Sequence, residues 1–242
     1  MPGYEDYVTR LRLYVECIAT LCRTDYEIIV VEEIDRRIVA RVRDFLTDEW
    51  LHSNKVKLLD YHADYRNPHG YNMIEAYAKN IGLKAARSPF VCITNCDLLF
   101  NDGFFDLCTR LQPKTFYRFL QYETPPPNVW DFKKIQGTLE SSVCFNPSIV
   151  DPANWNLKII AYKSGDVMLM DRESWLGIKG FPENEVWVHS DLIVCLVCNN
   201  VGMPLHVDPN AKVYTYPQER TLVERDFELK KTYEYAGRKT CN

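Results

Sequence analysis

The sequence has no long apolar run and no excess of positive charge. The longest apolar stretches, such as Ile28–Val31 and Leu192–Val197, are far shorter than the ~20 residues that a helix needs to span a bilayer. With 29 Lys and Arg against 33 Asp and Glu, the net charge is -4, so little basic surface is available to neutralise a phosphate backbone. We therefore expect neither a transmembrane segment nor a nucleic-acid partner.

The amino-terminal residues lack the basic start and apolar stretch of a signal peptide. The nine cysteines are an odd number and lie scattered in apolar segments, for example at Cys17, Cys92 and Cys195. This usage is typical of buried free thiols in a reducing compartment. The sequence thus predicts a cytoplasmic protein with free cysteines.

Several catalytic motifs are also missing. No Gly-x-Gly-x-x-Gly, Gly-x-x-x-x-Gly-Lys-Ser/Thr or Gly-x-Ser-x-Gly occurs, which disfavours a dinucleotide oxidoreductase, a P-loop nucleotidase and a serine hydrolase. The five histidines show no metal-ligand spacing. Cys195 and Cys198 lie in an apolar helical pattern with no second pair nearby, so core packing is the favoured interpretation.

The chain does contain 46% apolar and 26% charged residues, close to the globular average. Helical spacing of apolar residues, for example over Val8–Leu21 and Met73–Ala85, alternates with short apolar runs. The continuous runs at Ile28–Val31 and Phe90–Thr94 predict strands that are buried on both faces. This alternation predicts an α/β fold with a mixed, mostly parallel sheet flanked by helices.

The segment Asn95-Cys96-Asp97 directly follows one of these predicted strands. In an open α/β sheet, ligands bind outside the carboxyl ends of the strands, and a carboxylate there can hold a divalent cation. The alternative is that Asp97 only caps the helix that follows. On these three residues alone the two interpretations are equally strong.

An ordered set of motifs surrounds this segment. The stretch Ala78–Arg87 leads into the strand before Asn95, and Gly165–Trp175, Gly180–Glu183 and His189–Asp191 follow downstream. In this order the motifs resemble those of GT-A glycosyltransferases of the family 2-like group, over roughly Tyr26 to Tyr216. The resemblance implies a GT-A (Rossmann-like) fold, a UDP- or GDP-sugar donor, and a glycan or other hydroxyl acceptor.

The resemblance also implies roles for individual residues. Asp97 is the expected ligand of Mn²⁺ or Mg²⁺, with Asn95 in place of the first carboxylate of the family motif. The residues expected to bind the nucleotide sugar are Glu32, Glu33, Lys79, Asn80, Asn95, Cys96, Gly165, Asp166 and Glu183. Simpler interpretations also exist, because carboxylates at a strand end and a lysine on a helix are commonly just solvated.

Asp191 is the expected general base. A carboxylate at a helix start near the sugar could take the acceptor proton while attack occurs from the opposite face, which would make the reaction inverting. The alternative is that Ser190 or Asp191 only caps the helix that follows.

Two features depart from the family. GT-A chains normally begin with a strand whose end forms part of the nucleotide pocket, whereas here a helix begins by about Tyr7 and Met1–Asp6 is short and polar. We therefore expect the usual first strand to be lacking, either because the chain is a variant without it or because the chain starts inside a longer protein. Near Val213–Tyr216, where similar enzymes often place a metal-binding His, none occurs.

Together these features predict one domain over residues 1–242, with a nucleotide-binding half at about 1–122 and an acceptor-side half at about 123–242. The expected function is inverting, metal-assisted glycosyl transfer. The alternative is a degenerate GT-A domain that binds a nucleotide sugar or glycan without turnover. The lacking strand and Asn95 favour that alternative, while Asp97 and Asp191 disfavour it. A nucleotidyltransferase has less support, because the amino terminus holds no Gly-rich basic loop.

Overall fold

The structure, a computed structural model, describes residues 4–34, 41–44, 46, 49–50, 55–61, 75–124, 131–144, 167–183 and 190–216. Its helices and strands, in chain order, are α1 (Tyr4–Leu21), β1 (Ile28–Glu33), the 3-10 turn η1 (Val42–Asp44), β2 (Val56–Tyr61), α3 (Glu75–Ala85), β3 (Phe90–Ile93), β4 (Leu98–Phe100), α4 (Asp102–Cys108), β5 (Phe116–Glu123), α5 (Phe132–Ile135), η2 (Gln136–Ser141), β6 (Val143–Cys144), β7 (Met168–Asp171), α7 (Arg172–Gly177), α8 (Ser190–Asn200) and β8 (Leu205–Thr215).

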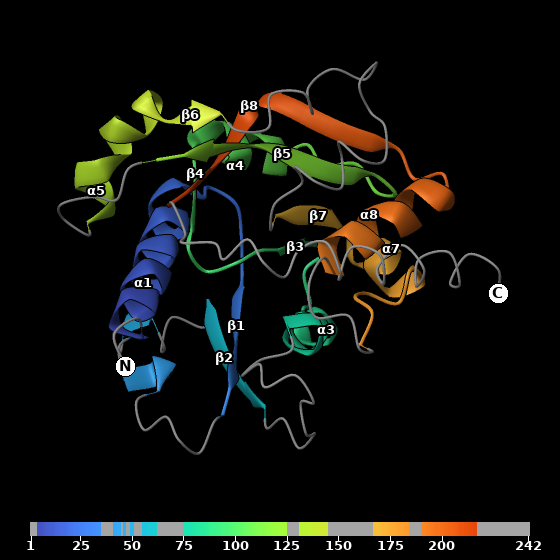
Figure 1. The fold of residues 1–242 in the computed structure, drawn as a ribbon, viewed down its shortest axis with the longest axis horizontal. Coiled ribbons are helices and arrows are strands. Elements are labelled where there is room, and N and C mark those ends of the chain that lie inside the picture. Colours follow the sequence, from blue (N-terminus) through green and yellow to red (C-terminus); the bar gives the residue numbers. More distant parts are fainter. Residues whose placement is uncertain are drawn as a thin grey trace, which may run out of the picture.

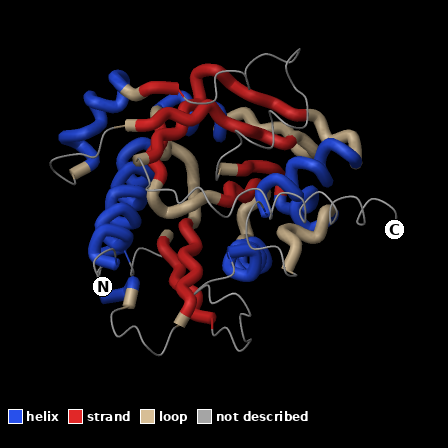
Figure 2. The backbone as a smooth tube through the Cα atoms, viewed as in Figure 1, coloured by secondary structure: helices blue, strands red, loops and turns tan. Residues whose placement is uncertain are grey.

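The described strands form two sheets with helices around them (Figure 1 and Figure 2). β1 and β2 pair in parallel, from Ile28 opposite Val56 to Glu33 opposite Tyr61. The second sheet has the order β3-β7-β5-β8-β4, with β6 paired to β5. Its longest pairing, β5 with β8, is parallel, and the shorter pairings are antiparallel. The predicted mixed α/β architecture is confirmed, and its longest pairings are the parallel ones.

β1 and β3 are both packed on two sides. Ile28 and Val30 of β1 contact the hydrophobic cluster that includes α1, whereas Ile29 contacts the cluster that includes α3. β3 alternates in the same way, since Cys92 packs against the first cluster and Ile93 belongs to the second. Packing on both faces explains why these strands are continuous apolar runs rather than alternating ones.

The helices confirm two of the predicted amphipathic patterns and correct a third. α1 and α3 cover the predicted helical segments, and α1 is the first described element, so in the described part of the chain no strand precedes it. The sequence also predicts a helix over Arg37–Leu46, but the residues described there, 41–44 and 46, form only η1. There Glu32 accepts from the N–H of Val42 and Asp44 accepts from the N–H of Arg41, and such side-chain bonds compete with helical ones.

The eight cysteines within the described residues are all free thiols. Cys195 and Cys198 are buried in α8, so the core-packing interpretation is confirmed. None of the helices that the structure describes is both long and apolar enough to cross a membrane.

Candidate functional site

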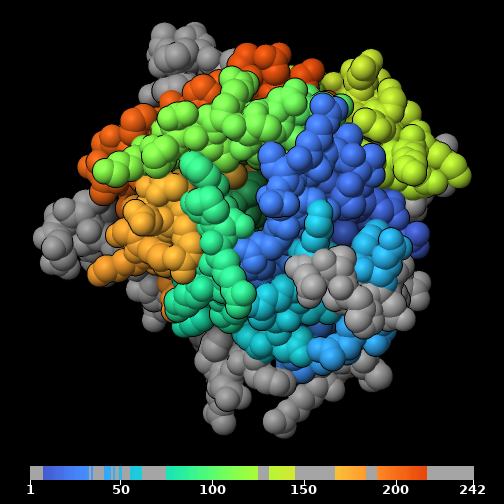
Figure 3. Space-filling view, turned by 180° about the vertical axis from the view of Figure 1, so that it is seen from behind, coloured from blue at the N-terminus to red at the C-terminus, as the bar shows by residue number. Residues whose placement is uncertain are grey.

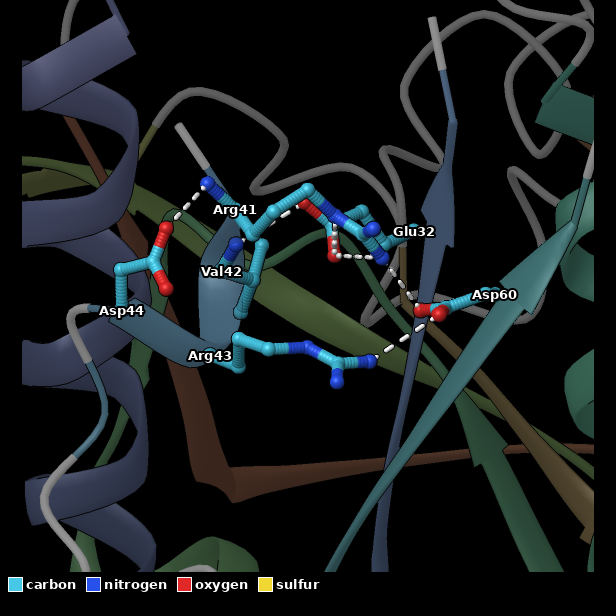
Figure 4. Close-up of polar contacts among 6 residues, drawn as sticks. All are labelled: Glu32, Arg41, Val42, Arg43, Asp44 and Asp60. Atoms are coloured by element: carbon cyan, nitrogen blue, oxygen red, sulfur yellow. Dashed lines mark hydrogen bonds and ion pairs between the residues drawn. The ribbon is translucent and has the colours of Figure 1, made fainter. Parts of the chain in front are cut away.

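Two acidic residues meet at the carboxyl ends of β1 and β2. Glu32 and Asp60 lie opposite each other in the parallel register, and Arg41 bridges them (Figure 4). The Arg41 Nη2 atom lies 3.2 Å from Glu32 Oε2 and 2.8 Å from Asp60 Oδ1. Arg43 adds a second bond to Asp60 at 3.0 Å. This arrangement, which we call the strand-end network, joins the tips of both strands to η1.

Both carboxylate oxygens of Glu32 accept hydrogen bonds in the strand-end network. Its Oε1 accepts from the Val42 N–H at 2.8 Å and its Oε2 accepts from Arg41 Nε at 3.2 Å. Hydrogen bonds from the guanidinium, first to Glu32 and then to Asp60, raise the pKa of Arg41. Glu33 ends β1 one residue later, and its side chain lies outside the described residues.

The residues after β3 contain a buried carboxylate with an unexpected partner. Asp97 is only 4% exposed, and its Oδ2 lies 3.7 Å from Nη1 of Arg10 on α1. The Arg10 guanidinium also lies over the ring of Tyr216, 5.8 Å from its centroid. A buried carboxylate needs such a countercharge, and α1 supplies it through Arg10. Nothing in the sequence around Arg10 signals this contact.

Within the described residues, Asp97 offers a divalent cation a single carboxylate. Hard cations such as Mg²⁺ take about six oxygen ligands, and the carboxylate of Asp97 already faces a guanidinium. Among the described residues, no three His, Cys, Asp or Glu side chains gather closely enough to hold a metal ion. Asp97 thus offers a cation at most one carboxylate ligand, and Arg10 competes with the cation for that carboxylate.

Asn80 forms a clamp inside the protein. Its Nδ2 donates to Phe181 O at 2.9 Å and to Glu183 Oε1 at 2.8 Å, and its Oδ1 accepts from the Phe181 N–H at 2.9 Å. Gly180 makes this possible, since a Cβ atom there would lie 2.3 Å from Asn80 Oδ1 and the residue has a φ of 62°. The Gly180–Glu183 motif therefore docks on α3 through Asn80.

Lys79 lies beside this clamp. Its ammonium pairs with Glu75 one turn earlier on α3 and stands 5.0 Å from the centroid of the Phe181 ring. The Lys79 side chain also lines a large cavity.

A cavity of about 950 Å³ lies between α1, β1, α3 and β3. We call it the central cavity, and Figure 3 shows the surface hollowed between α1, in blue, and the teal-green chain of α3 and β3. Four of the predicted site residues line it, namely Glu32, Lys79, Asn95 and Cys96. Asn80 and Glu183 instead line a separate groove of about 430 Å³.

Of the other predicted residues that the structure describes, Asp97 and Asp191 are not part of the lining of the central cavity. Asp191 is half-buried in the first turn of α8, and Gly165 and Asp166 lie outside the described residues. The structure also adds Arg10 and Arg41, which sequence reasoning missed because their partners are distant in the chain or follow an irregular turn.

No protein-family model matches this chain, and no curated protein matches its sequence. Solved structures do match its shape. The mannosyltransferase PcManGT from Pyrobaculum calidifontis, in complex with GDP-Man and Mn²⁺, aligns with a TM-score of 0.53 at 16% identity, covering 94% of this chain and 61% of its own. GalNAc-T7 with UDP, GalNAc and Mn²⁺ aligns with a TM-score of 0.54 at 12% identity, covering 84% of this chain and 40% of its own. S. aureus TarS 1-349 aligns with a TM-score of 0.52 at 13% identity, covering 90% of this chain and 56% of its own.

These similarities establish the fold alone. Identities this low carry no residue-level correspondence. The chain has the GT-A fold of glycosyltransferases, as the motifs predicted. It spans between 40% and 61% of the length of the three matched structures.

Proposed function

We propose that this protein is a glycosyltransferase that moves a sugar from a nucleotide-diphosphate sugar to an acceptor hydroxyl. The observation that carries the proposal is the GT-A fold, which it shares with proteins solved with GDP-Man or with UDP and GalNAc. The polar residues at the carboxyl ends of β1 and β3 support it, because open α/β sheets bind ligands at that edge.

In this proposal the donor lies along the carboxyl ends of β1 and β3. Glu32 and Glu33 meet the nucleotide base, and Asn95 meets the ribose. The remaining contacts to diphosphate, donor sugar and acceptor are assigned to Lys79, Asn80, Cys96, Gly165, Asp166 and Glu183. Support for Glu32, Lys79, Asn95 and Cys96 comes from their shared position around the central cavity. For Asn80 and Glu183, the clamp on Phe181 points to a positioning role.

The chemistry needs one proton acceptor. The acceptor hydroxyl attacks the anomeric carbon of the donor while the bond from that carbon to the diphosphate oxygen breaks. Asp191 takes the hydroxyl proton, and the electron pair of the broken bond leaves with the nucleoside diphosphate. Attack from the face opposite the leaving group inverts the anomeric configuration. The half-buried position of Asp191 in the first turn of α8 is compatible with this role.

Mn²⁺ or Mg²⁺ would supply Lewis-acid neutralisation of the diphosphate when bound, and Asp97 is the residue we assign to hold it. Because Arg10 pairs with the same carboxylate, metal binding requires that this ion pair open. Asp97→Asn should therefore lower both transfer and the melting-temperature shift that Mn²⁺ adds to donor binding, while the protein stays folded.

A second function is favoured by the same ion pair. If Arg10 holds Asp97 permanently, the chain is a degenerate GT-A module that binds a nucleotide sugar or glycan without turnover.

A thermal-shift panel of UDP- and GDP-sugars, with and without Mn²⁺, followed by a donor-hydrolysis assay, separates the two. A ligand at 100 times its Kd stabilises the folded state by about 2.7 kcal/mol, a clear shift. Stabilisation with hydrolysis supports the transferase, and stabilisation without hydrolysis or transfer supports the binding module. Failure of every nucleotide sugar to stabilise the protein would contradict both.

A further inference from the structure

The strand-end network fixes how Glu32 meets the central cavity. Glu32, Arg41 and Val42 all line the cavity, whereas Asp60 is not part of its lining. The side chain of Glu32 is only 10% exposed, and it is held by the N–H of Val42 and by the guanidinium of Arg41. A group that is held in this way keeps one hydrogen-bonding pattern toward a ligand.

The two carboxylate oxygens of Glu32 differ in what they can still accept. Oε2 lies 3.2 Å from both Nε and Nη2 of Arg41, and these two nitrogens match its two lone-pair sites. Oε1 accepts one bond, from the N–H of Val42 at 2.8 Å, which leaves it a second site. Within the described residues, Glu32 therefore has one acceptor site to offer a ligand, on Oε1.

Arg41 is itself held in place and keeps a donor group. Its Nη2 lies 2.8 Å from Asp60 Oδ1, and Asp60 Oδ2 pairs with Arg43 at 3.0 Å (Figure 4). Among the residues that the structure describes, no hydrogen bond or ion pair engages Nη1 of Arg41. A guanidinium has five N–H donors, so Arg41 can donate to a ligand in the cavity while it holds Glu32.

One acceptor site beside one donor distinguishes between nucleobases. The Watson–Crick edge of uracil has one N–H between two carbonyl oxygens, whereas that of guanine has two adjacent N–H groups beside one carbonyl. A carboxylate accepts both guanine N–H groups by using both of its oxygens, which Glu32 cannot do while Arg41 faces Oε2. The second guanine N–H would meet the guanidinium instead, donor against donor. The uracil edge has no such conflict.

We propose that Arg41 sets the nucleobase specificity of the donor site, so that the protein takes a uridine nucleotide in preference to a guanosine nucleotide. Glu32 accepts from the single uracil N–H, and Arg41 donates to a neighbouring carbonyl oxygen. Asp60 acts through Arg41, because it pairs with the guanidinium without lining the cavity. The inference rests on the proposed function, in which Glu32 meets the nucleotide base, and it names the donor class.

The first test measures the dissociation constants of UDP and GDP for the full chain by isothermal titration calorimetry, at one fixed concentration of Mn²⁺. GDP should bind about tenfold more weakly than UDP or worse, since a site that pairs with the polar groups of a substrate rejects an analogue that leaves them unpaired. N3-methyl-UDP lacks the uracil N–H and should lose about tenfold against UDP as well. GDP binding as tightly as UDP, or N3-methyl-UDP binding as tightly as UDP, would overturn the proposal.

Two variants separate specificity from general support of the site. Arg41→Met removes the guanidinium from Glu32 Oε2, so the ratio of the GDP to the UDP dissociation constant should fall about tenfold, toward one. Arg43→Met is the matched control, because Arg43 pairs with Asp60 and is not part of the cavity lining. It should leave the ratio within about twofold of wild type.

A purely structural role for Arg41 would weaken the binding of both nucleotides alike and leave their ratio unchanged, which would overturn the proposal. Thermal melting checks that both variants are folded. If Arg41→Met does not fold, the wild-type ratio and the N3-methyl-UDP measurement decide.

Failure of this inference is distinguishable from failure of the proposed function. Equal affinities of wild type for UDP and GDP would leave donor binding in place and overturn only the role of Arg41. Failure of wild type to bind either nucleotide would overturn both.

Discussion

At the scale of single residues, two carboxylates hold together parts of the chain that are distant in sequence. Glu27 ties the start of β1 to Arg87 and Ser88, and Asp171 accepts from the backbone N–H of Lys114 and of Ser174 at the start of α7. For both groups burial alone raises the pKa, but these hydrogen bonds outweigh it, so both pKa values lie below the ordinary range.

The lowered pKa of Glu27 predicts a pH-dependent stability. The contribution of Glu27 is complete above its ordinary pKa of 4.5 and is lost as the pH falls through the lower folded-state value. Glu27→Gln should therefore destabilise the protein by about 1 kcal/mol at pH 7, and the difference from wild type should shrink below about pH 4. Urea unfolding at several pH values measures this, and a difference that does not shrink as the pH falls below 4.5 would contradict it.

Gly180 offers a second residue-scale prediction. Its positive φ and the 2.3 Å approach that a Cβ would make to Asn80 Oδ1 leave no room for a side chain. Gly180→Ala should cost about 2–4 kcal/mol, since it combines backbone strain with a broken clamp. Gly177→Ala is the matched control, because a Cβ there meets nothing within 4 Å and should change stability by less than about 1 kcal/mol. Equal costs in thermal or urea unfolding would refute the clamp.

Asn80 and Asp97 could be predicted from the sequence as candidate site residues, but their contacts could not. The family motifs point at both positions, yet the partners Phe181 and Arg10 lie in other segments of the chain. Local spacing cannot reveal a partner that only tertiary folding brings near, so an expected ligand contact at Asn80 and an internal clamp look alike in the sequence.

At the scale of elements, the strands and helices with strong periodicity were predictable and the short ones were not. Continuous apolar runs located β1 and β3, because both faces of these strands are packed. β4 and α7 are too short for a period to show. A signal for α7 was present, however, since Asp171 and Ser174 have the spacing of a helix cap, and the side chain of Asp171 does accept from the Ser174 N–H.

Among the described strands, β1 pairs only with β2 and its other edge faces the central cavity, which predicts unequal sensitivity between strands. Val31 of β1 is half-buried beside the central cavity, whereas Val213 of β8 is fully buried between β5 and β4. Val213→Thr should destabilise the protein by about 1–3 kcal/mol because its hydroxyl is desolvated, and Val31→Thr should cost less than about 1 kcal/mol. Thermal unfolding of the two variants compares them, and an equal loss would mean that the cavity side of β1 is closed.

At the scale of the whole molecule, the fold gathers polar residues from separate segments at the carboxyl ends of β1 and β3. Of the nine residues that the sequence predicted as one nucleotide-sugar site, four line the central cavity, namely Glu32, Lys79, Asn95 and Cys96. The sequence could not predict that Arg41 and Arg10 neutralise Glu32 and Asp97, because η1 and the amino-terminal helix approach the strand ends only in the folded protein. The role of Asp191 as general base stays a prediction.

The central claim is transfer or hydrolysis of a nucleotide-sugar donor with Asp191 as the base, and donor turnover by wild type and by Asp191→Asn measures it most directly. Asp106→Asn is the control, since Asp106 is exposed on α4. We expect wild type and Asp106→Asn to turn over at least one UDP- or GDP-sugar, and Asp191→Asn to lose about 100-fold or more in kcat while it stays folded. Full activity of Asp191→Asn would remove it from the base role, and no turnover of any donor by wild type would contradict the claim.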